Sequence, residues 1–394
     1  MSGLSSASLR AWQRDALGIW LTRRRGVASV VTGAGKTTFA LACLAQVRQE
    51  DPGIRALIVV PTIALLDQWI VELETELGLQ RDDIAVHGGG RHGLASAPVH
   101  VAVVNTARSL TSGLTSSGRW MLIADECHRY GAPANRNAIA GDWSAALGLS
   151  ATPVREYDDY FEQFVAPETG EVFFEYSYDD ALRDGVLTPF SLCNYQVELT
   201  LEERDSLSSV DRTIARLLAD ASDSEALKRA TFRRSRIIQS ARSRLPAARE
   251  LIRKHRGLRA IVFHEQIAAA ELLVGLLIRD GHRVVAYHSG ISAPKRQKNL
   301  LMFRTHQADV LVTCRALDEG LDVPDAEYGL ICASTASTRQ RIQRLGRLVR
   351  KAQGKTHAEV ATIFAGDHEE ERLRKEAAQL LGIASVRWFK VMLK

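Results

Sequence analysis

Short apolar runs recur along the chain, and segments with the helical spacing of apolar residues lie between them. In the first half, the runs that we expect to be buried strands span residues 27–31, 54–60, 99–105, 120–124 and 145–149. In the second half, they span residues 259–264, 283–288, 308–313, 328–333 and 358–364. Strands that alternate with helices form parallel sheets with helices on both faces. The pattern therefore predicts an α/β protein with two such sheets.

The two series of predicted strands are separated by a segment of different character. Residues 158–190 are acidic and aromatic, and residues 198–256 have the spacing of helices rich in Arg and Ser. A chain of 394 residues usually divides into domains, because a single core stops growing near about 250–300 residues. We therefore expect one α/β domain at residues 1–160, a connecting region at 161–245 that is basic and helical toward its end, and a second α/β domain at 246–394.

The composition is that of a globular protein, with 46% apolar and 25% charged residues, and it excludes a disordered chain. No apolar stretch approaches the roughly 18–20 residues that cross a bilayer, and the first residues lack the layout of a signal peptide. The five cysteines are far apart and include no C-x-x-C pair, which argues against a disulfide scaffold and a structural zinc site. We expect a soluble, cytoplasmic protein with no membrane partner.

The net charge is +5, but its distribution is uneven. Residues 228–259 contain twelve Lys and Arg side chains and one acidic residue, Glu250, so this stretch carries +11 and the rest of the chain 5 − 11 = −6. Such a stretch favours a polyanionic partner, although an exposed helix face or a site for an acidic protein also fits. Phe232 is its one aromatic residue, which favours contact with a duplex backbone over base stacking.

Residues 31–38, Val-Thr-Gly-Ala-Gly-Lys-Thr-Thr, follow a predicted strand and begin a helical pattern. Glycines in this setting bring backbone N–H groups close to phosphate oxygens at the positive end of a helix. Lys36 would then span the phosphates and the Thr37 hydroxyl would bind Mg²⁺, with the nucleotide also held by Thr32, Gly33, Ala34, Gly35 and Thr38. The general pattern has glycine where Val30 stands, yet Lys36 is the only lysine in the first 227 residues. The alternative is a glycine-rich turn that caps a helix.

Asp125 and Glu126 directly follow the predicted strand 120–124. They therefore lie at the carboxyl edge of the sheet, where open α/β sheets bind ligands. Asp125 is suited to hold Mg²⁺ through its water shell, and Glu126 is suited to orient and deprotonate the water that attacks the γ-phosphate. A strand that ends in exposed acidic residues is common by itself, but its place after a phosphate-binding loop favours the catalytic interpretation.

Asp125-Glu126-Cys127-His128 resembles motif II of the superfamily 2 helicases, a variant of the DEAD and DEAH boxes. Further segments resemble the motifs of that family in the family's order: residues 9–13 (adenine motif), 59–69 (Ia), 104–110 (Ib), 150–153 (III), 261–264 (IV), 313–324 (V) and 343–350 (VI). Residues 33–37, 149–156 and 343–347 are similar to the branch of the xeroderma pigmentosum group B helicase and the motor subunits of type I and type III restriction enzymes. Where the repair helicases have Arg-Glu-Asp after motif III, this chain has Arg155-Glu156-Tyr157.

The resemblance implies a fold and a set of site residues. The fold is two tandem RecA-like parallel-sheet domains joined by a partly helical connecting region, with ATP and Mg²⁺ bound between the domains. The nucleotide contacts implied are Arg10, Gln13, Gly320 and Asp322, and the arginines that neutralise the γ-phosphoryl charge are Arg347 and Arg350. The residues implied to couple the nucleotide to the strand are His128, Ser150, Thr152 and Gln343. The nucleic-acid contacts implied are Pro61, Thr62, Thr106, His264 and Thr313.

We therefore expect an ATP-dependent nucleic-acid motor, a helicase or a translocase on double-stranded DNA, that serves repair, restriction or phage defence. Protein partners would supply targeting or nuclease function. One alternative is an RNA helicase or remodeller with the same core. The other is a nucleotide-gated DNA-binding subunit of a larger complex, which the intact set of ATPase residues argues against.

Three further features have plain interpretations. His87 and His92 flank a glycine loop that we expect to be a turn rather than a metal site. Cys127 is expected to fill space at a strand end rather than act as a nucleophile. Residues 386–392 either bind a partner or pack against their own domain.

Overall fold

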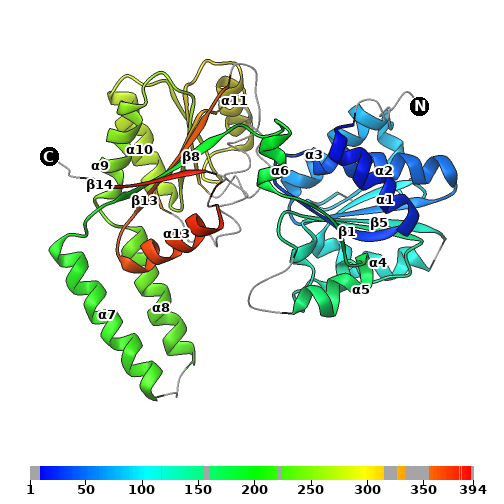
Figure 1. Cartoon of the computed structure of the whole chain (residues 1–394), viewed down its shortest axis with the longest axis horizontal. Coiled ribbons are helices and arrows are strands. Elements are labelled where there is room, and N and C mark those ends of the chain that lie inside the picture. Colours follow the sequence, from blue (N-terminus) through cyan, green and yellow to red (C-terminus); the bar gives the residue numbers. More distant parts are fainter. Residues whose placement is uncertain are drawn as a thin grey trace. The chain divides into compact units, whose positions relative to one another are not determined.

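The computed structural model describes residues 9–91, 93–116, 118–153, 159–220, 224–314, 326–333, 355–380, 382 and 384–391. The chain forms two compact units, Met1–Val186 (unit 1) and Leu187–Lys394 (unit 2), and each is described by itself (Figure 1). The boundary lies inside the predicted connecting region 161–245. That region is thus divided between the two units instead of forming a separate part.

Unit 1 is built on a parallel sheet. Among its described residues, seven strands have the order β3-β4-β2-β5-β6-β1-β7, and every pair is parallel. The strands are β1 (Arg25–Val30), β2 (Arg55–Val60), β3 (Ile84–His87), β4 (Val99–Val103), β5 (Trp120–Asp125), β6 (Ala145–Ser150) and β7 (Val172–Tyr176). The residues of β5 and β6 are buried throughout, as expected for central strands covered on both faces.

The helices of unit 1 precede, connect or follow these strands. They are α1 (Ala11–Arg23), α2 (Lys36–Glu50), α3 (Ile63–Leu77), α4 (Val104–Thr115), α5 (Ala166–Thr169) and α6 (Tyr178–Arg183). Shorter helical segments are η2 (Arg81–Asp83), η3 (Cys127–Arg129), η4 (Arg136–Ala138) and η5 (Phe161–Val165). Buried apolar side chains, including Leu57, Trp120 and Leu122, form the core between sheet and helices.

Unit 2 repeats this architecture. Its described residues form a second seven-stranded parallel sheet with the order β10-β11-β9-β12-β13-β8-β14. The strands are β8 (Phe190–Gln196), β9 (Ala260–His264), β10 (Val284–Tyr287), β11 (Val310–Cys314), β12 (Tyr328–Ile331), β13 (Ala358–Phe364) and β14 (Ser385–Lys390). The helices are α7 (Leu201–Asp220), α8 (Ser224–Gln239), α9 (Arg244–Lys254), α10 (Ile267–Arg279), α11 (Ala293–Arg304) and α13 (Asp367–Gln379).

The predicted fold class is confirmed, since each predicted strand overlaps an observed one and both sheets are parallel. The helices predicted within residues 198–256 are α7, α8 and α9. Helices α7 and α8 pack side by side as a hairpin that extends away from the sheet of unit 2 (Figure 1). Strand β14 pairs with β8, so the C-terminal segment packs against its own unit, which was one of its two interpretations.

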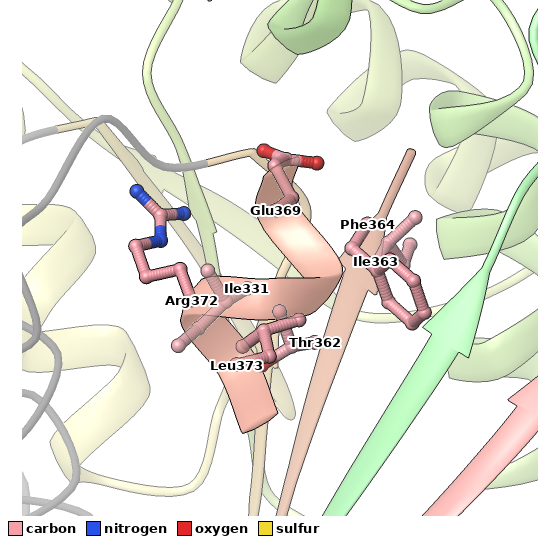
Figure 2. Close-up of a pocket in the computed structure, with 7 residues that line it drawn as sticks. All are labelled: Ile331, Thr362, Ile363, Phe364, Glu369, Arg372 and Leu373. Carbon is pink, nitrogen blue, oxygen red and sulfur yellow. The ribbon is translucent and has the colours of Figure 1, made fainter. Parts of the chain in front are cut away.

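A buried ion pair joins four elements of unit 2. The Arg244 guanidinium at the start of α9 donates to the carbonyl oxygens of Cys332 (2.7 Å) and Ile363 (2.6 Å), which follow β12 and lie in β13. It also donates to Glu369 Oε2 of α13 at 2.5 Å. Removing one partner of such a pair leaves an uncompensated buried charge. Beside it, α13 and the ends of β12 and β13 border a small depression, where the Arg372 guanidinium points away from Ile331 and Thr362 (Figure 2).

In the part of the chain that the structure describes, no helix has the length and apolarity of a membrane span.

Candidate nucleotide site

The predicted site residues of unit 1 follow the carboxyl ends of neighbouring strands. In the sheet order, β4 is followed by motif Ib, β2 by motif Ia and β5 by the carboxylates of motif II. Next to them, β6 is followed by motif III and β1 by the glycine-rich loop. Because all these strands are parallel, their carboxyl ends lie at one edge of the sheet. The fold therefore brings together segments that are more than a hundred residues apart in sequence.

The glycine-rich loop lies between β1 and α2. Gly33 (φ 92°) and Gly35 (φ 99°) have positive φ, a conformation that side chains other than glycine rarely adopt. Gly35 is the N-cap of α2, which begins at Lys36. The first N–H groups of a helix have no partner within it, so they are available to phosphate oxygens at the positive end of the macrodipole. The Lys36 ammonium contacts the Val30 carbonyl oxygen at 3.1 Å, so it folds back over the loop.

Two residues of the adenine motif hold this loop from α1. Arg10 Nη1 donates to the Ala34 carbonyl oxygen at 2.8 Å, and Gln13 Nε2 donates to the Gly35 carbonyl oxygen at 2.9 Å. Gln13 Oε1 accepts from the Arg10 backbone N–H at 2.8 Å. An amide carries two donor hydrogens and two acceptor lone pairs, so Gln13 keeps one of each for an adenine edge.

Asp125 and Glu126 are held differently. Asp125 is buried at the end of β5, whereas Glu126 is partly exposed and has a positive φ of 50°. Burial and the neighbouring Glu126 carboxylate raise the pKa of Asp125 to about 6, while a hydrogen bond from Trp69 and the Lys36 charge act in the opposite direction. A nearby cation such as Mg²⁺ would offset that raising effect and favour the carboxylate form.

The residues predicted to couple motifs II and III are in contact. His128 Nδ1 lies 3.0 Å from Ser150 Oγ and 3.5 Å from Glu126 Oε2. Ser150 Oγ in turn accepts from the Thr152 backbone N–H at 3.1 Å. A continuous chain of polar contacts therefore links the candidate general base to motif III.

This arrangement fits a nucleoside triphosphate and Mg²⁺. The Thr32 hydroxyl in the loop is buried and has no hydrogen-bond partner, as expected of a group that hydrogen-bonds to a ligand when the ligand is bound. Lys36 and the α2 N-terminus suit phosphate oxygens. The Thr37 hydroxyl is an oxygen ligand of the kind that Mg²⁺ prefers, and the Asp125 carboxylate would hold the ion through its bound water.

Three predicted nucleic-acid contacts lie at the same edge. Pro61 and Thr62 follow β2 and are partly exposed, and Thr106 is partly exposed in the first turn of α4. Thr62 is the N-cap of α3, and its hydroxyl accepts from the Leu65 N–H at 3.3 Å. The starts of α3 and α4 are therefore accessible to phosphate groups.

The other two predicted contacts, His264 and Thr313, are buried in unit 2. His264 at the end of β9 is 4% exposed, and its Nδ1 accepts from the Gln266 N–H. Burial, assisted by the Arg244 charge, lowers the pKa of His264 to about 4. Thr313 in β11 is fully buried. Both side chains are therefore buried at strand ends of unit 2, and their contact with a nucleic acid stays a prediction.

Several predicted residues lie outside the described part of the chain. These are Gly320, Asp322, Gln343, Arg347 and Arg350.

Two plain interpretations fit the structure. Gly88 and Arg91 close a turn through reciprocal backbone hydrogen bonds of 3.2 and 3.1 Å, and His87 points to His100, its Nε2 lying 3.1 Å from Nδ1. His92 lies outside the described residues. Cys127 is fully buried in the unit 1 core, as expected of a space-filling side chain.

Two residues that the sequence analysis missed contact Asp125. The Trp69 indole N–H donates to Asp125 Oδ2 at 2.9 Å, and the Tyr130 hydroxyl contacts the Asp125 backbone oxygen at 2.7 Å. The Tyr130 hydroxyl also lies 2.9 Å from the Val59 carbonyl oxygen of the neighbouring strand β2. The sequence signal for Trp69 is its position seven residues after Thr62, two turns along one helix face.

Two family models match the chain. The model described as type III restriction enzyme, res subunit, matches residues 6–155, and the helicase conserved C-terminal domain matches residues 243–352. Each model therefore lies mainly on one of the two units.

Two named relatives are similar over most of this chain. A protein of Sulfurisphaera tokodaii named DNA 3'-5' translocase XPB2 is 27% identical, with 93% of this chain and 84% of that protein covered. A Kineococcus radiotolerans protein named DNA 3'-5' helicase XPB is 25% identical, with 92% and 61% covered, so this chain spans less than two thirds of its length.

Solved structures agree on the fold. The type ISP restriction-modification enzyme LlaBIII bound to DNA matches with a TM-score of 0.70 at 16% identity, covering 98% of this chain and 31% of that one. This likeness confirms the fold as two tandem RecA-like domains. The motif series, the two family models and the relatives agree, and the chain is similar to the superfamily 2 helicases, in the branch of the xeroderma pigmentosum group B helicases and restriction-enzyme motors.

Proposed function

We propose that this chain is an ATP-driven motor that moves along double-stranded DNA. The observation that carries the proposal is the joint placement, at one sheet edge, of the glycine-rich loop with Lys36 and of the Glu126–His128–Ser150 contacts. This placement supports ATP hydrolysis whose turnover is linked to a bound strand through motif III.

The residues at this edge have distinct parts in the reaction. Lys36 and the N-terminus of α2 stabilise the charge on the phosphates, and Glu126 orients the attacking water and accepts its proton. Thr37, and Asp125 through bound water, would hold Mg²⁺, which would supply positive charge to the phosphate oxygens. In the proposed motor, Arg347 and Arg350 neutralise charge on the γ-phosphoryl group. Gly320 and Asp322 contact the nucleotide, and Gln343 couples it to the strand.

The choice of double-stranded DNA rests on two supports. The relatives above are named as DNA translocases and helicases, which favours DNA over the RNA alternative. The exposed arginines of α8, namely Arg229, Arg233 and Arg236, are spaced four and three residues apart and so lie on one helix face. A row of cations with few aromatics suits contact with phosphates without reading of sequence, as a stepping motor requires.

The central test measures ATP hydrolysis with and without duplex DNA. We expect stimulation by duplex DNA, and loss of turnover in Lys36→Ala and Glu126→Gln. Lys375→Ala and Glu371→Gln are matched controls, since these exposed side chains form an ion pair on α13 of unit 2. A wild-type chain that does not hydrolyse ATP over a broad range of salt and DNA substrates would refute the proposal.

Two further measurements separate the alternatives. Stimulation by structured RNA in excess of that by duplex DNA would favour the RNA remodeller. Displacement of a roadblock bound to the duplex, driven by ATP, is expected of the motor. A chain that binds ATP and changes its DNA affinity without displacing the roadblock would be a nucleotide-gated clamp.

A further inference from the structure

The Mg²⁺ position of the proposed ATPase has an unusual neighbour. Trp69 lies on α3, the helix whose N-cap is the candidate nucleic-acid contact Thr62, and its side chain is 1% exposed. The indole N–H donates to Asp125 Oδ2 at 2.9 Å. This bond joins a helix of motif Ia to the carboxylate of motif II.

The bond differs from the other buried indole hydrogen bonds of unit 1. Trp20 and Trp143 donate to neutral backbone carbonyl oxygens, of Ala146 at 3.2 Å and of Ile139 at 2.8 Å. The partner of Trp69 is a carboxylate, and hydrogen bonds to charged acceptors are about twice as strong as those between neutral groups. If Trp69 only filled space, an apolar ring without an N–H would serve equally well. The hydrogen bond to Asp125 therefore favours a role for the indole N–H.

The two oxygens of Asp125 have separate donors. Oδ2 accepts from Trp69, and Oδ1 accepts from the Glu126 backbone N–H at 3.0 Å. These bonds fix the plane of the carboxylate, and each oxygen keeps lone pairs for further donors. Metal-bound water is such a donor, and hydrogen bonds to a ligating carboxylate typically change metal affinity by about 10–100-fold when removed.

We infer that Trp69 is a positioning residue whose indole N–H orients the Asp125 carboxylate toward the water shell of Mg²⁺. This inference rests on the proposed function. It also links α3 to the Mg²⁺ position, because a shift of this helix would move the Trp69 indole N–H together with Thr62, which lies two turns away.

The test measures the affinity of Mn²⁺ for the ADP complex of the full chain by electron paramagnetic resonance. In Trp69→Phe we expect this affinity to fall by about tenfold or more. The half-saturating Mg²⁺ concentration for ATP hydrolysis should rise in parallel, while kcat at saturating Mg²⁺ stays close to that of the wild type. A merely structural role would lower the melting temperature without this shift in metal affinity.

Trp143→Phe is the matched control, since it also removes one buried indole hydrogen bond, but at the amino end of β6. We expect its Mn²⁺ affinity to be unchanged. Trp69→Leu has no side-chain donor and replaces Trp69→Phe if that variant does not fold, with the same expected result.

Wild-type Mn²⁺ affinity in a folded Trp69 variant, or an equal loss in Trp143→Phe, would overturn the inference. Because the measurement needs no turnover, its outcome is separate from that of the proposed function. The proposed function fails only if the wild-type chain shows no ATP hydrolysis.

Discussion

At the scale of single residues, Gly35 has little freedom to change. Its φ is 99°, and a Cβ at this position would lie 2.9 Å from Gln13 Nε2. A side chain in this left-handed conformation costs about 1–2 kcal/mol, and the Gln13 amide would have to leave the Gly35 carbonyl oxygen. The free loop can relax to avoid both costs, but it must return to the strained conformation to bind phosphates.

We therefore expect Gly35→Ala to weaken ATP binding by about tenfold or more, since about 1.4 kcal/mol corresponds to tenfold. Titration with a fluorescent ATP analogue measures this change. Gly275→Ala in α10 is the control, because a Cβ there meets nothing within 4 Å. It should raise the free energy of unfolding by about 0.5–1 kcal/mol and leave ATP affinity unchanged. Wild-type ATP affinity in Gly35→Ala would show that the loop binds in another conformation.

At the scale of elements, a pH-dependent contact joins α9 to β13. His255 Nδ1 lies 2.8 Å from the Leu251 carbonyl oxygen and its Nε2 lies 3.3 Å from Glu359 Oε1. Both neighbours are acceptors, so the doubly protonated ring satisfies both. The hydrogen bond with Glu359 and that with Leu251 raise the pKa of His255 against the effect of burial, and the His255 contact lowers the pKa of Glu359.

The directions of the two pKa shifts define the pH range in which the contact stabilises the fold. The raised pKa of His255 stabilises the fold fully below about pH 6.5, and this contribution is lost as the pH rises through the folded-state value. The lowered pKa of Glu359 stabilises the fold above about pH 4.5, and this contribution is lost as the pH falls through its folded-state value. The contact is thus strongest in mildly acidic solution.

We expect His255→Gln to lower the free energy of unfolding by about 1 kcal/mol or less near pH 6, with the difference from the wild type shrinking toward pH 9. Thermal unfolding of both chains across this range measures it. In a Glu359→Gln background the effect of the His255 substitution should lose its pH dependence. A difference that stays constant from pH 6 to pH 9 would contradict the assignment.

The elements also show what the sequence could reveal. The central strands were predicted because they are continuous apolar runs, buried on both faces. Strands β3, β7, β8 and β14 were missed for local reasons. β3 has four residues, β7 and β14 are edge strands with partly exposed side chains, and β8 contains buried polar residues such as Asn194. Their pairing is set by tertiary contacts that a local pattern does not contain.

At the scale of the whole molecule, the sequence predicted the contiguous motifs of the candidate site but not the contacts and the burial that depend on tertiary packing. The glycine-rich loop and Asp125-Glu126 are contiguous motifs whose conformation follows from a strand, a turn and a helix start. The bond between Trp69 and Asp125 instead depends on how α3 packs over β5, and the burial of His264 and Thr313 depends on the packing of unit 2. A resemblance to a motif indicates that a residue belongs to a site, but it does not show whether the side chain of that residue is exposed.

The charge distribution of the whole chain leads to a prediction about salt. The first 186 residues contain 16 Lys and Arg against 22 Asp and Glu, whereas α8 presents the exposed row Arg229, Arg233 and Arg236. Each phosphate contact contributes about −0.9 to the slope of log K against log salt concentration, because bound cations release counterions from DNA. Replacing all three arginines by glutamine should therefore make this slope shallower by about 2–3 and weaken duplex binding at low salt, as measured by fluorescence anisotropy with a labelled duplex.

The control replaces Arg81, Arg119 and Arg183 of unit 1 by glutamine, which removes the same charge. These side chains are exposed and each forms an ion pair with an acidic neighbour. Because an arginine already paired with a carboxylate gains less from a phosphate, the slope should change little in this variant. An equal change in both triple variants would mean that the duplex senses only the net charge of the chain. A distinct change in the α8 variant would instead place phosphate contacts on the hairpin, far along the sequence from the motifs that hydrolyse ATP.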